Sequence, residues 1–112
     1  MLKNRRRFAR VRASLRFTLA WGERFELFRT VDLSAAGALL VRHVPDSPLP
    51  LVGTEAECAF NIDSTEIRVK VLVVRSPRGS CAVRFVGLER RLEDRIAAWV
   101  FRMEAQRLAR RF

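Results

Sequence analysis

Residues 10–21 read RVRASLRFTLAW, and the prediction of the fold class starts from their pattern. Apolar side chains occupy alternate positions from Val11 to Trp21, and mostly arginine, serine and threonine lie between them. Such alternation is typical of a β-strand that has one face in the core and the other in solvent. Gly22-Glu23 follows directly and precedes residues 24–33, which are rich in Phe, Val and Thr. A two-residue link that starts with glycine predicts a type II′ hairpin between two strands.

Four more strands are predicted downstream: a short one at residues 38–41, and three with apolar residues at alternate positions, at residues 56–62, 67–73 and 81–85. Turn-like segments separate them: residues 34–37, the proline-rich residues 43–50, the hairpin tip Asp63-Ser64 and residues 77–80. From residue 89 the apolar positions recur every three or four residues, with acidic side chains early and arginines late, which predicts a helix. The expected fold is mainly β: a small six-stranded antiparallel β-barrel over residues 10–87 and a C-terminal α-helix over residues 89–112.

The length and composition indicate one globular domain. A chain of 112 residues can bury one core but not two. Hydrophobic residues make up 49% and charged residues 30%, which excludes a disordered or low-complexity chain. No apolar run approaches the roughly 18 residues of a membrane span, and no export signal is present, so we expect a cytoplasmic protein without a membrane segment. Cys58 and Cys81 are expected to be reduced core residues.

Positive charge is concentrated at the two ends of the chain. The 22 Lys and Arg residues outnumber the 12 Asp and Glu residues, for a net charge of +10. Residues 1–20 and 101–112 carry the whole excess, and residues 21–100 are neutral. Residues 1–9 are therefore expected to form a flexible basic arm. Because 20 of the 22 basic residues are arginine, the balance favours bidentate recognition of phosphate, with a solubilising or nucleic-acid-binding tail as the alternative.

The patterns typical of catalytic and metal sites are missing. His43 is the only histidine and lies in the proline-rich loop with no cysteine near it. Apart from His43, no histidine is present to activate Ser34, and no lysine lies near it in the sequence. The sequence contains no nucleophile elbow, glycine-rich phosphate loop or HExxH motif. We therefore expect no enzymatic activity, no metal site and no cofactor.

Two short motifs indicate a ligand-binding function instead. Residues 6–10, RRFAR, form an RxxxR motif just before the first strand, and Arg5 precedes it. Residues 32–37, DLSAAG, form a DxSxxG motif at the turn between the second and third strands. With both motifs in this order and strand context, the chain resembles the PilZ domain family, the bacterial receptors of cyclic di-GMP. The resemblance extends from Asn4 to about Leu88 and includes the closing strand at residues 82–87.

This resemblance implies a role for each motif residue. Arg6 and Arg10 are each expected to donate two hydrogen bonds to a phosphate or to the O6 and N7 acceptors of a guanine. Asp32 is expected to accept hydrogen bonds from guanine N1 and N2, and Ser34 to donate its hydroxyl to the base or to a phosphate. Gly37 is expected to provide a turn with positive φ and no side chain in the ligand's way.

The same resemblance implies roles for two further arginines, Arg5 and Arg75. Arg5, the residue before RxxxR, is a third cation, and its identity favours an intercalated pair of nucleotides over a single one. Arg75 is expected on the barrel surface near a guanine face, where its guanidinium plane would stack. Arg107, near the end of the helix, is expected to lie far from the ligand. The site residues expected from the sequence are thus Arg5, Arg6, Arg10, Asp32, Ser34, Gly37 and Arg75.

Two rival functions remain open at this point. A small basic β-barrel could bind nucleic acid, but such barrels usually place aromatic residues among the basic ones, and only Phe8 lies among these arginines. A PilZ-like adaptor could bind protein partners and ignore nucleotides. In the receptor hypothesis the signal must also pass to a partner protein, because no other domain is attached. We expect cyclic di-GMP and a downstream protein as partners, and no nucleic acid or membrane.

The expected helix carries two apolar stripes. Leu92, Ile96, Val100 and Met103 form one stripe, and a second one comprises Ala97, Phe101, Ala105, Leu108 and Phe112. One residue advances a helix by about 100°, so the two stripes face different neighbours. The barrel can cover one of them. A broad groove of the same domain could bury the second stripe; otherwise the stripe predicts a homodimer or a hydrophobic partner at this helix.

Overall fold

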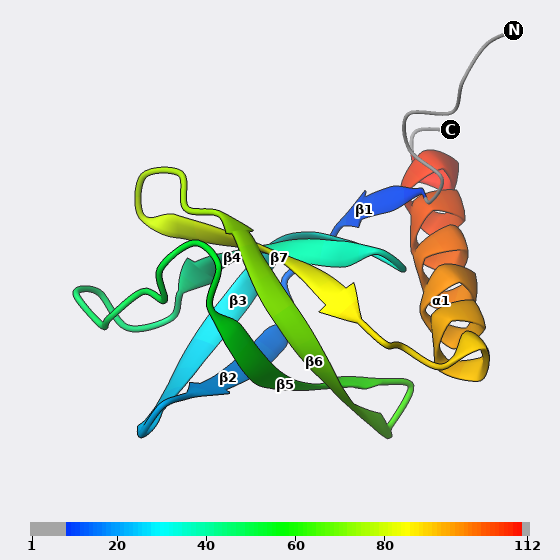
Figure 1. The fold of residues 1–112 in the computed structure, drawn as a ribbon. Helices are drawn as coiled ribbons and strands as arrows, with labels where there is room; N and C mark the ends of the chain where they lie inside the picture. The colour runs from blue at the N-terminus through cyan, green and yellow to red at the C-terminus, as the bar shows by residue number, and fades with distance from the viewer. Residues whose placement is uncertain (1–8, 111–112) are drawn as a thin grey trace, which may run out of the picture.

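A computed structural model describes residues 9–110 of the chain. Its elements, in chain order, are β1 (Arg10–Arg12), β2 (Arg16–Trp21), β3 (Arg24–Ser34), β4 (Gly37–Arg42), β5 (Glu55–Ile62), β6 (Thr65–Arg75), β7 (Ser80–Val86) and α1 (Arg90–Ala109). All strand pairs are antiparallel, and β3 also pairs with β4, which closes the sheet. Strands β2 to β7 therefore form a six-stranded barrel, and β1 is an extra strand on the end of β3 (Figure 1). The expected fold class is confirmed.

The barrel interior is filled by the side chains that alternation predicted to be buried. Phe17 of β2 stacks on Phe60 of β5 with ring centroids 4.1 Å apart, and Phe60 stacks on Phe85 of β7 at 5.8 Å. Cys58 and Cys81 are buried free thiols within this core, as expected. Burial raises the pKa of Cys81 to about 11 and the pKa of Cys58 well above its ordinary value. At neutral pH both thiols therefore stay protonated.

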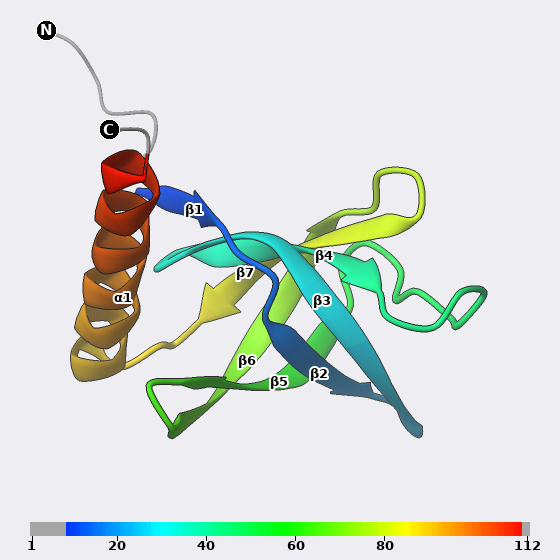
Figure 2. The same ribbon diagram turned by 180° about the vertical axis from the view of Figure 1, so that it is seen from behind.

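The single strand expected over residues 10–21 is in fact two strands. The chain leaves the ladder between β1 and β2, where the side chain of Thr30 replaces ladder hydrogen bonds. The Leu15 amide donates to Thr30 Oγ1 at 2.7 Å, and this hydroxyl donates to the carbonyl of Ala13. Both strands still pair with β3, so β1 lies beside its last residues and β2 beside its first (Figure 2). The break thus separates the strand that carries Arg10 from the barrel wall.

The two predicted hairpin tips are confirmed. Trp21 pairs with Arg24, and Gly22 alone in the link has positive φ, at +58°, the sign pattern of a type II′ turn. Ile62 pairs with Thr65, and Asp63 and Ser64 both have positive φ, as in a type I′ turn. Both turns match the right-handed twist of the strands that they join.

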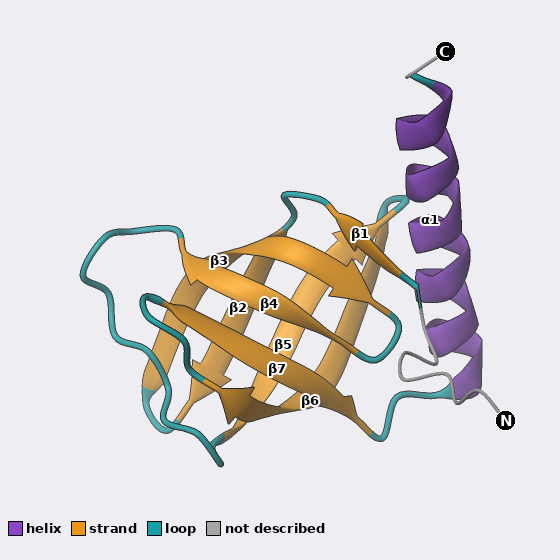
Figure 3. Cartoon of the chain, turned by 90° about the horizontal axis from the view of Figure 1, so that it is seen from above, coloured by secondary structure: helices purple, strands orange, loops and turns teal. Residues whose placement is uncertain are grey.

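Helix α1 lies at one end of the barrel and runs past β1 (Figure 3). The side chains of Ile96, Trp99 and Val100 are buried and belong to the core cluster, whereas most residues after 100 are exposed. The first expected stripe therefore packs on the barrel, although Leu92 and Met103 at its ends are only half-buried. Among the described residues, no helix is long and apolar enough to cross a membrane.

Candidate functional site

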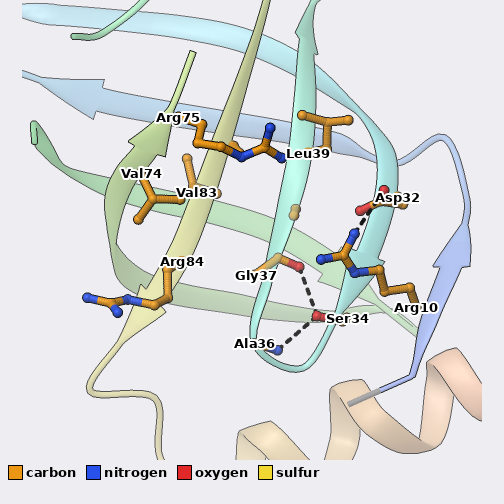
Figure 4. A pocket seen from close by; sticks show the side chains of 12 residues that line it. Arg10, Asp32, Ser34, Ala36, Gly37, Leu39, Val74, Arg75, Val83 and Arg84 are labelled. Atoms are coloured by element: carbon orange, nitrogen blue, oxygen red, sulfur yellow. Dashed lines mark hydrogen bonds and ion pairs between the residues drawn. The ribbon is translucent and has the colours of Figure 1, made fainter. Parts of the chain in front are cut away.

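Arg10, the last residue of the first motif, meets the second motif at one cavity on the outside of the barrel (Figure 4). We call it the motif cavity; it has a volume of about 230 Å³ and is lined by Arg10, Asp32, Ser34, Ala36, Gly37, Ala38, Leu39, Val74, Arg75, Ala82, Val83 and Arg84. Five of the seven expected site residues line it, from the four strands β1, β3, β4 and β6. The other two, Arg5 and Arg6, lie outside the described residues. The structure thus brings together every expected site residue that it describes.

Strand pairing places Arg10 beside the second motif. Arg10 of β1 pairs with Ser34 of β3, and Arg12 pairs with Asp32. The Arg10 guanidinium lies 3.9 Å from the Asp32 carboxylate, and the two side chains are 49% and 24% exposed. Exposed ion pairs of this kind contribute at most about 1 kcal/mol. A ligand that offers an anion to Arg10 and donors to Asp32 can therefore replace this pair at little cost.

Ser34 shapes the turn of the second motif from within. Its Oγ accepts a hydrogen bond from the Ala36 amide at 3.1 Å and donates one to the Gly37 carbonyl at 3.4 Å. The residue is only 6% exposed, so the hydroxyl mainly holds the turn between β3 and β4. Because the bond to Gly37 is long, the hydroxyl proton can turn to an acceptor in the cavity instead.

The reason for glycine at position 37 differs from the expected one. The expected positive φ is wrong, because positive φ occurs among the described glycines at Gly22, Gly53, Gly79 and Gly87 only. A Cβ atom at Gly37 would instead lie 2.1 Å from the carbonyl oxygen of Val83. Glycine is needed here for the close approach of β4 and β7, which pair through Gly37 and Arg84.

A β-bulge in β3 turns Asp32 out of the barrel. Thr30 pairs with Leu40 and Asp32 with Leu39, so Val31 is an extra residue in β3. Thr30 and Leu40 are buried, and strict alternation would turn Asp32 inward as well. The extra residue shifts the alternation, so that Leu33 is buried and Asp32 reaches the motif cavity.

A second bulge, in β6, does the same for Arg75. Val73 pairs with Val83 and Arg75 with Ala82, which makes Val74 the extra residue. The buried residues of β6 occupy odd positions up to Val73, so Arg75 would otherwise point into the core. In Figure 4 its guanidinium extends across the cavity toward Leu39. Two bulges therefore aim the acidic and one of the basic side chains at the same space.

The sequence analysis missed part of the cavity wall. Leu39 and Val74 give it apolar patches, and Arg84 of β7 stands at its edge with its side chain pointing away from Ser34 (Figure 4). Arg84 lies within the strand expected at residues 81–85, but its place beside the DxSxxG turn was not predicted. That place follows from the pairing of β4 with β7, which no sequence motif records.

Arg107 is not remote from the motifs, and that expectation is wrong. A second cavity, of about 380 Å³, lies between β1 and α1 and is lined by Arg10, Val11, Arg12, Asp32, Glu104 and Arg107. It shares Arg10 and Asp32 with the motif cavity. Arg107 forms an ion pair with Glu104, and the hydrogen bond between them raises the pKa of the Arg107 guanidinium. The last turns of α1 thus lie next to the motif residues.

Comparisons with known proteins agree on one family and one fold. The family model "PilZ domain" matches residues 4–102. No curated protein matches the chain. Among solved structures, the inhibitor of motility MotI/DgrA from Bacillus subtilis gives a TM-score of 0.80 at 15% identity, over 93% of this chain and 53% of that one. This chain thus spans about half the length of MotI.

Two isolated PilZ domains match over nearly their whole length. The PilZ domain of YcgR from Escherichia coli, solved with c-di-GMP, gives a TM-score of 0.73 at 15% identity, over 96% of this chain and 97% of that one. The PilZ domain of CeSA from a cellulose-synthesizing bacterium gives 0.66 at 21% identity, over 86% and 98%. At these identities the likeness establishes the fold alone.

Proposed function

The chain belongs to the PilZ domain family, and on that basis we propose that it is a bacterial second-messenger receptor that binds cyclic di-GMP in the motif cavity and signals through a partner protein. The observation that carries the proposal is the meeting of Arg10 with Asp32, Ser34 and Gly37 at one cavity, although the two motifs are far apart in the sequence. The function is one of binding, and no catalytic step is proposed.

The chemistry of the cavity suits a guanine nucleotide with phosphates. Asp32 can accept from guanine N1 and N2, which a guanine offers side by side on one edge. Arg10 can leave Asp32 and donate two hydrogen bonds to a phosphate, or to O6 and N7 of a guanine base. The Arg75 guanidinium extends over the cavity above apolar groups, where a planar cation can stack on a base.

Arg5 and Arg6 complete the proposed site. The motif cavity, at about 230 Å³, is smaller than the roughly 300–1,000 Å³ of typical ligand sites, so the described residues enclose only part of a nucleotide. We assign to Arg6 a bidentate contact to a phosphate or a guanine, like that of Arg10. We assign to Arg5 a further phosphate contact, which favours a pair of nucleotides. Calorimetric stoichiometry tests this assignment: a ratio of two nucleotides per chain supports the pair, and a ratio of one contradicts it.

Calorimetry on the purified chain tests the receptor function. We expect a dissociation constant on the order of micromolar or tighter, which is about 8 kcal/mol. Arg10→Ala and Asp32→Ala should each weaken binding by roughly 2 kcal/mol, about thirtyfold, because each leaves ligand groups unpaired. Arg68→Ala is the matched control, since Arg68 is exposed, pairs with Glu66 at 3.0 Å and does not line the motif cavity.

Two outcomes would contradict the receptor function. One is the absence of heat up to about 100 μM nucleotide from protein that circular dichroism shows to be folded. The other is an equal loss of affinity for Arg68→Ala and Arg10→Ala, which would indicate diffuse attraction between charges rather than a site. A pull-down from bacterial lysate with and without nucleotide then tests the partner, which we expect to bind in only one of the two conditions.

A further inference from the structure

The last turns of helix α1 have a polar side near the motif residues and an apolar stripe in solvent. Phe101 and Leu108, from the second stripe expected in the sequence, are 71% and 45% exposed, so the barrel does not bury that stripe; Phe112 lies outside the described residues. A partner at this stripe stays a prediction. Glu104 and Arg107 instead line the cavity of about 380 Å³ between β1 and α1, and β1 lies beside this part of α1 in two opposite views (Figure 1, Figure 2). We call this space the helix cavity.

The helix cavity adjoins the motif cavity. Arg10 and Asp32 line both cavities, and these two side chains form the ion pair at 3.9 Å. A ligand that separates Arg10 from Asp32 therefore borders the helix cavity as well. Because the motif cavity has a volume of only about 230 Å³, the helix cavity offers space for a ligand group that the motif cavity leaves outside.

Arg12 is the cation that β1 adds to the helix cavity. Arg10 and Arg12 are exposed on the same face of β1, because Val11 between them is buried on the other. Arg12 also pairs across the ladder with Asp32, the residue to which the guanine is assigned. Side chains two residues apart on one face of a strand are separated by roughly 7 Å, so two long arginines at this spacing can reach the same ligand.

The charges around the helix cavity favour an anion at Arg12. Three arginines and two carboxylates line the cavity, which leaves one positive charge in excess. Asp32 is paired with Arg10, and Glu104 is paired with Arg107. Arg12 forms no ion pair and no side-chain hydrogen bond with any residue that the structure describes. An anion that reaches Arg12 neutralises the excess charge and does not have to break the pair on α1.

We propose that the helix cavity is an anion subsite in which Arg12 binds a phosphate of the nucleotide whose guanine lies against Asp32. The inference rests on the proposed function, since the phosphate belongs to cyclic di-GMP. This ligand holds two phosphates in one ring, so a molecule that presents one of them to Arg10 has a second one to place. The functional motif then extends from RxxxR over residues 6–10 to RxxxRxR over residues 6–12.

Calorimetry with cyclic di-GMP tests the subsite. Arg12→Ala should weaken binding about tenfold, the loss expected for one hydrogen bond between charged groups. Arg16→Ala is the matched control, because Arg16 of β2 is also exposed, forms no ion pair with a described residue and lines neither cavity. It removes the same charge, so its effect measures diffuse attraction alone.

The same titrations separate failure of the subsite from failure of the receptor function. Equal affinities of Arg12→Ala and Arg16→Ala, together with weaker binding by Arg10→Ala, would overturn the subsite and leave the proposed function standing. A wild-type chain that binds no cyclic di-GMP would overturn both.

A conservative variant and phosphorus NMR test which ligand group Arg12 contacts. Arg12→Lys keeps the charge but loses the planar pair of donors, so it should retain most of the affinity for a phosphate. The phosphorus signal of bound cyclic di-GMP should shift in Arg12→Ala and stay unchanged in Arg16→Ala. Binding by Arg12→Lys as weak as that by Arg12→Ala, or an unchanged phosphorus signal in Arg12→Ala, would overturn the phosphate contact.

Discussion

Replacement of Gly37 by alanine should lower the Tm of the barrel, whether or not a nucleotide is bound. The added Cβ would lie 2.1 Å from the Val83 carbonyl oxygen, more than 1 Å short of ordinary contact, so β4 and β7 must move apart. Overpacking costs about 1–3 kcal/mol, and the weakened ladder hydrogen bonds add about 1 kcal/mol. For a domain of this size each kcal/mol lowers Tm by roughly 4 °C. We therefore expect a decrease of about 8–16 °C.

Thermal unfolding followed by circular dichroism, without nucleotide, measures this effect. Gly79→Ala is the control, because it makes the same chemical change where a Cβ meets nothing within 4 Å. It places alanine at a φ of +70°, which costs about 1–2 kcal/mol, so its Tm should decrease less. A Gly37→Ala variant with the wild-type Tm but without nucleotide binding would refute the packing argument, because the glycine would then serve the ligand alone.

Three further predictions follow from the fold and the site. Thr30→Val should cost about 1–3 kcal/mol of unfolding free energy in a urea titration, because the Leu15 amide and the Ala13 carbonyl lose their partner. The folded state should lose stability as pH rises from about 9 to 11, because Cys81, with a pKa of about 11, and Cys58, whose pKa burial also raises, stay protonated in the folded chain while the unfolded chain loses both protons near the ordinary pKa; Cys81→Ala should make the Tm profile less steep, and Cys58 should account for part of the remaining slope. Single-stranded RNA should bind more weakly than cyclic di-GMP at about 150 mM salt in competition calorimetry, and tighter RNA binding with a steep salt dependence would favour the nucleic-acid function instead.

Periodicity predicted most of the barrel strands, because the alternation of buried and exposed side chains along a strand appears directly in the sequence. Phe17 and Leu19 of β2 alternate with polar residues, and both are fully buried. The break before β2 escaped prediction, because Ala13 and Leu15 continue the alternation while their hydrogen bonds go to a side chain on another strand. The break depends on a partner 15 or more residues away, which no local pattern records.

The motifs identified the site residues that meet, but not how they come to face the same way. Both bulged segments contain an additional valine, and valine is equally suited to the inside and the outside of a strand. Residues 30–33 and 73–75 therefore look like uninterrupted strand in the sequence. Pairing with β4 and β7 decides which valine is the extra one, and pairing across a barrel is a long-range property.

Each extra valine exchanges the inward-facing and outward-facing positions in the rest of its strand. Removal of Val31 or Val74 would leave every motif residue in place and return the strand to its uninterrupted frame, with Asp32 or Arg75 directed at the hydrophobic interior. Two chains can then share both motifs letter for letter and still differ in whether a cavity exists. In this chain, the number of residues between the last inward-facing position of each strand and the site residue decides whether that side chain reaches the motif cavity.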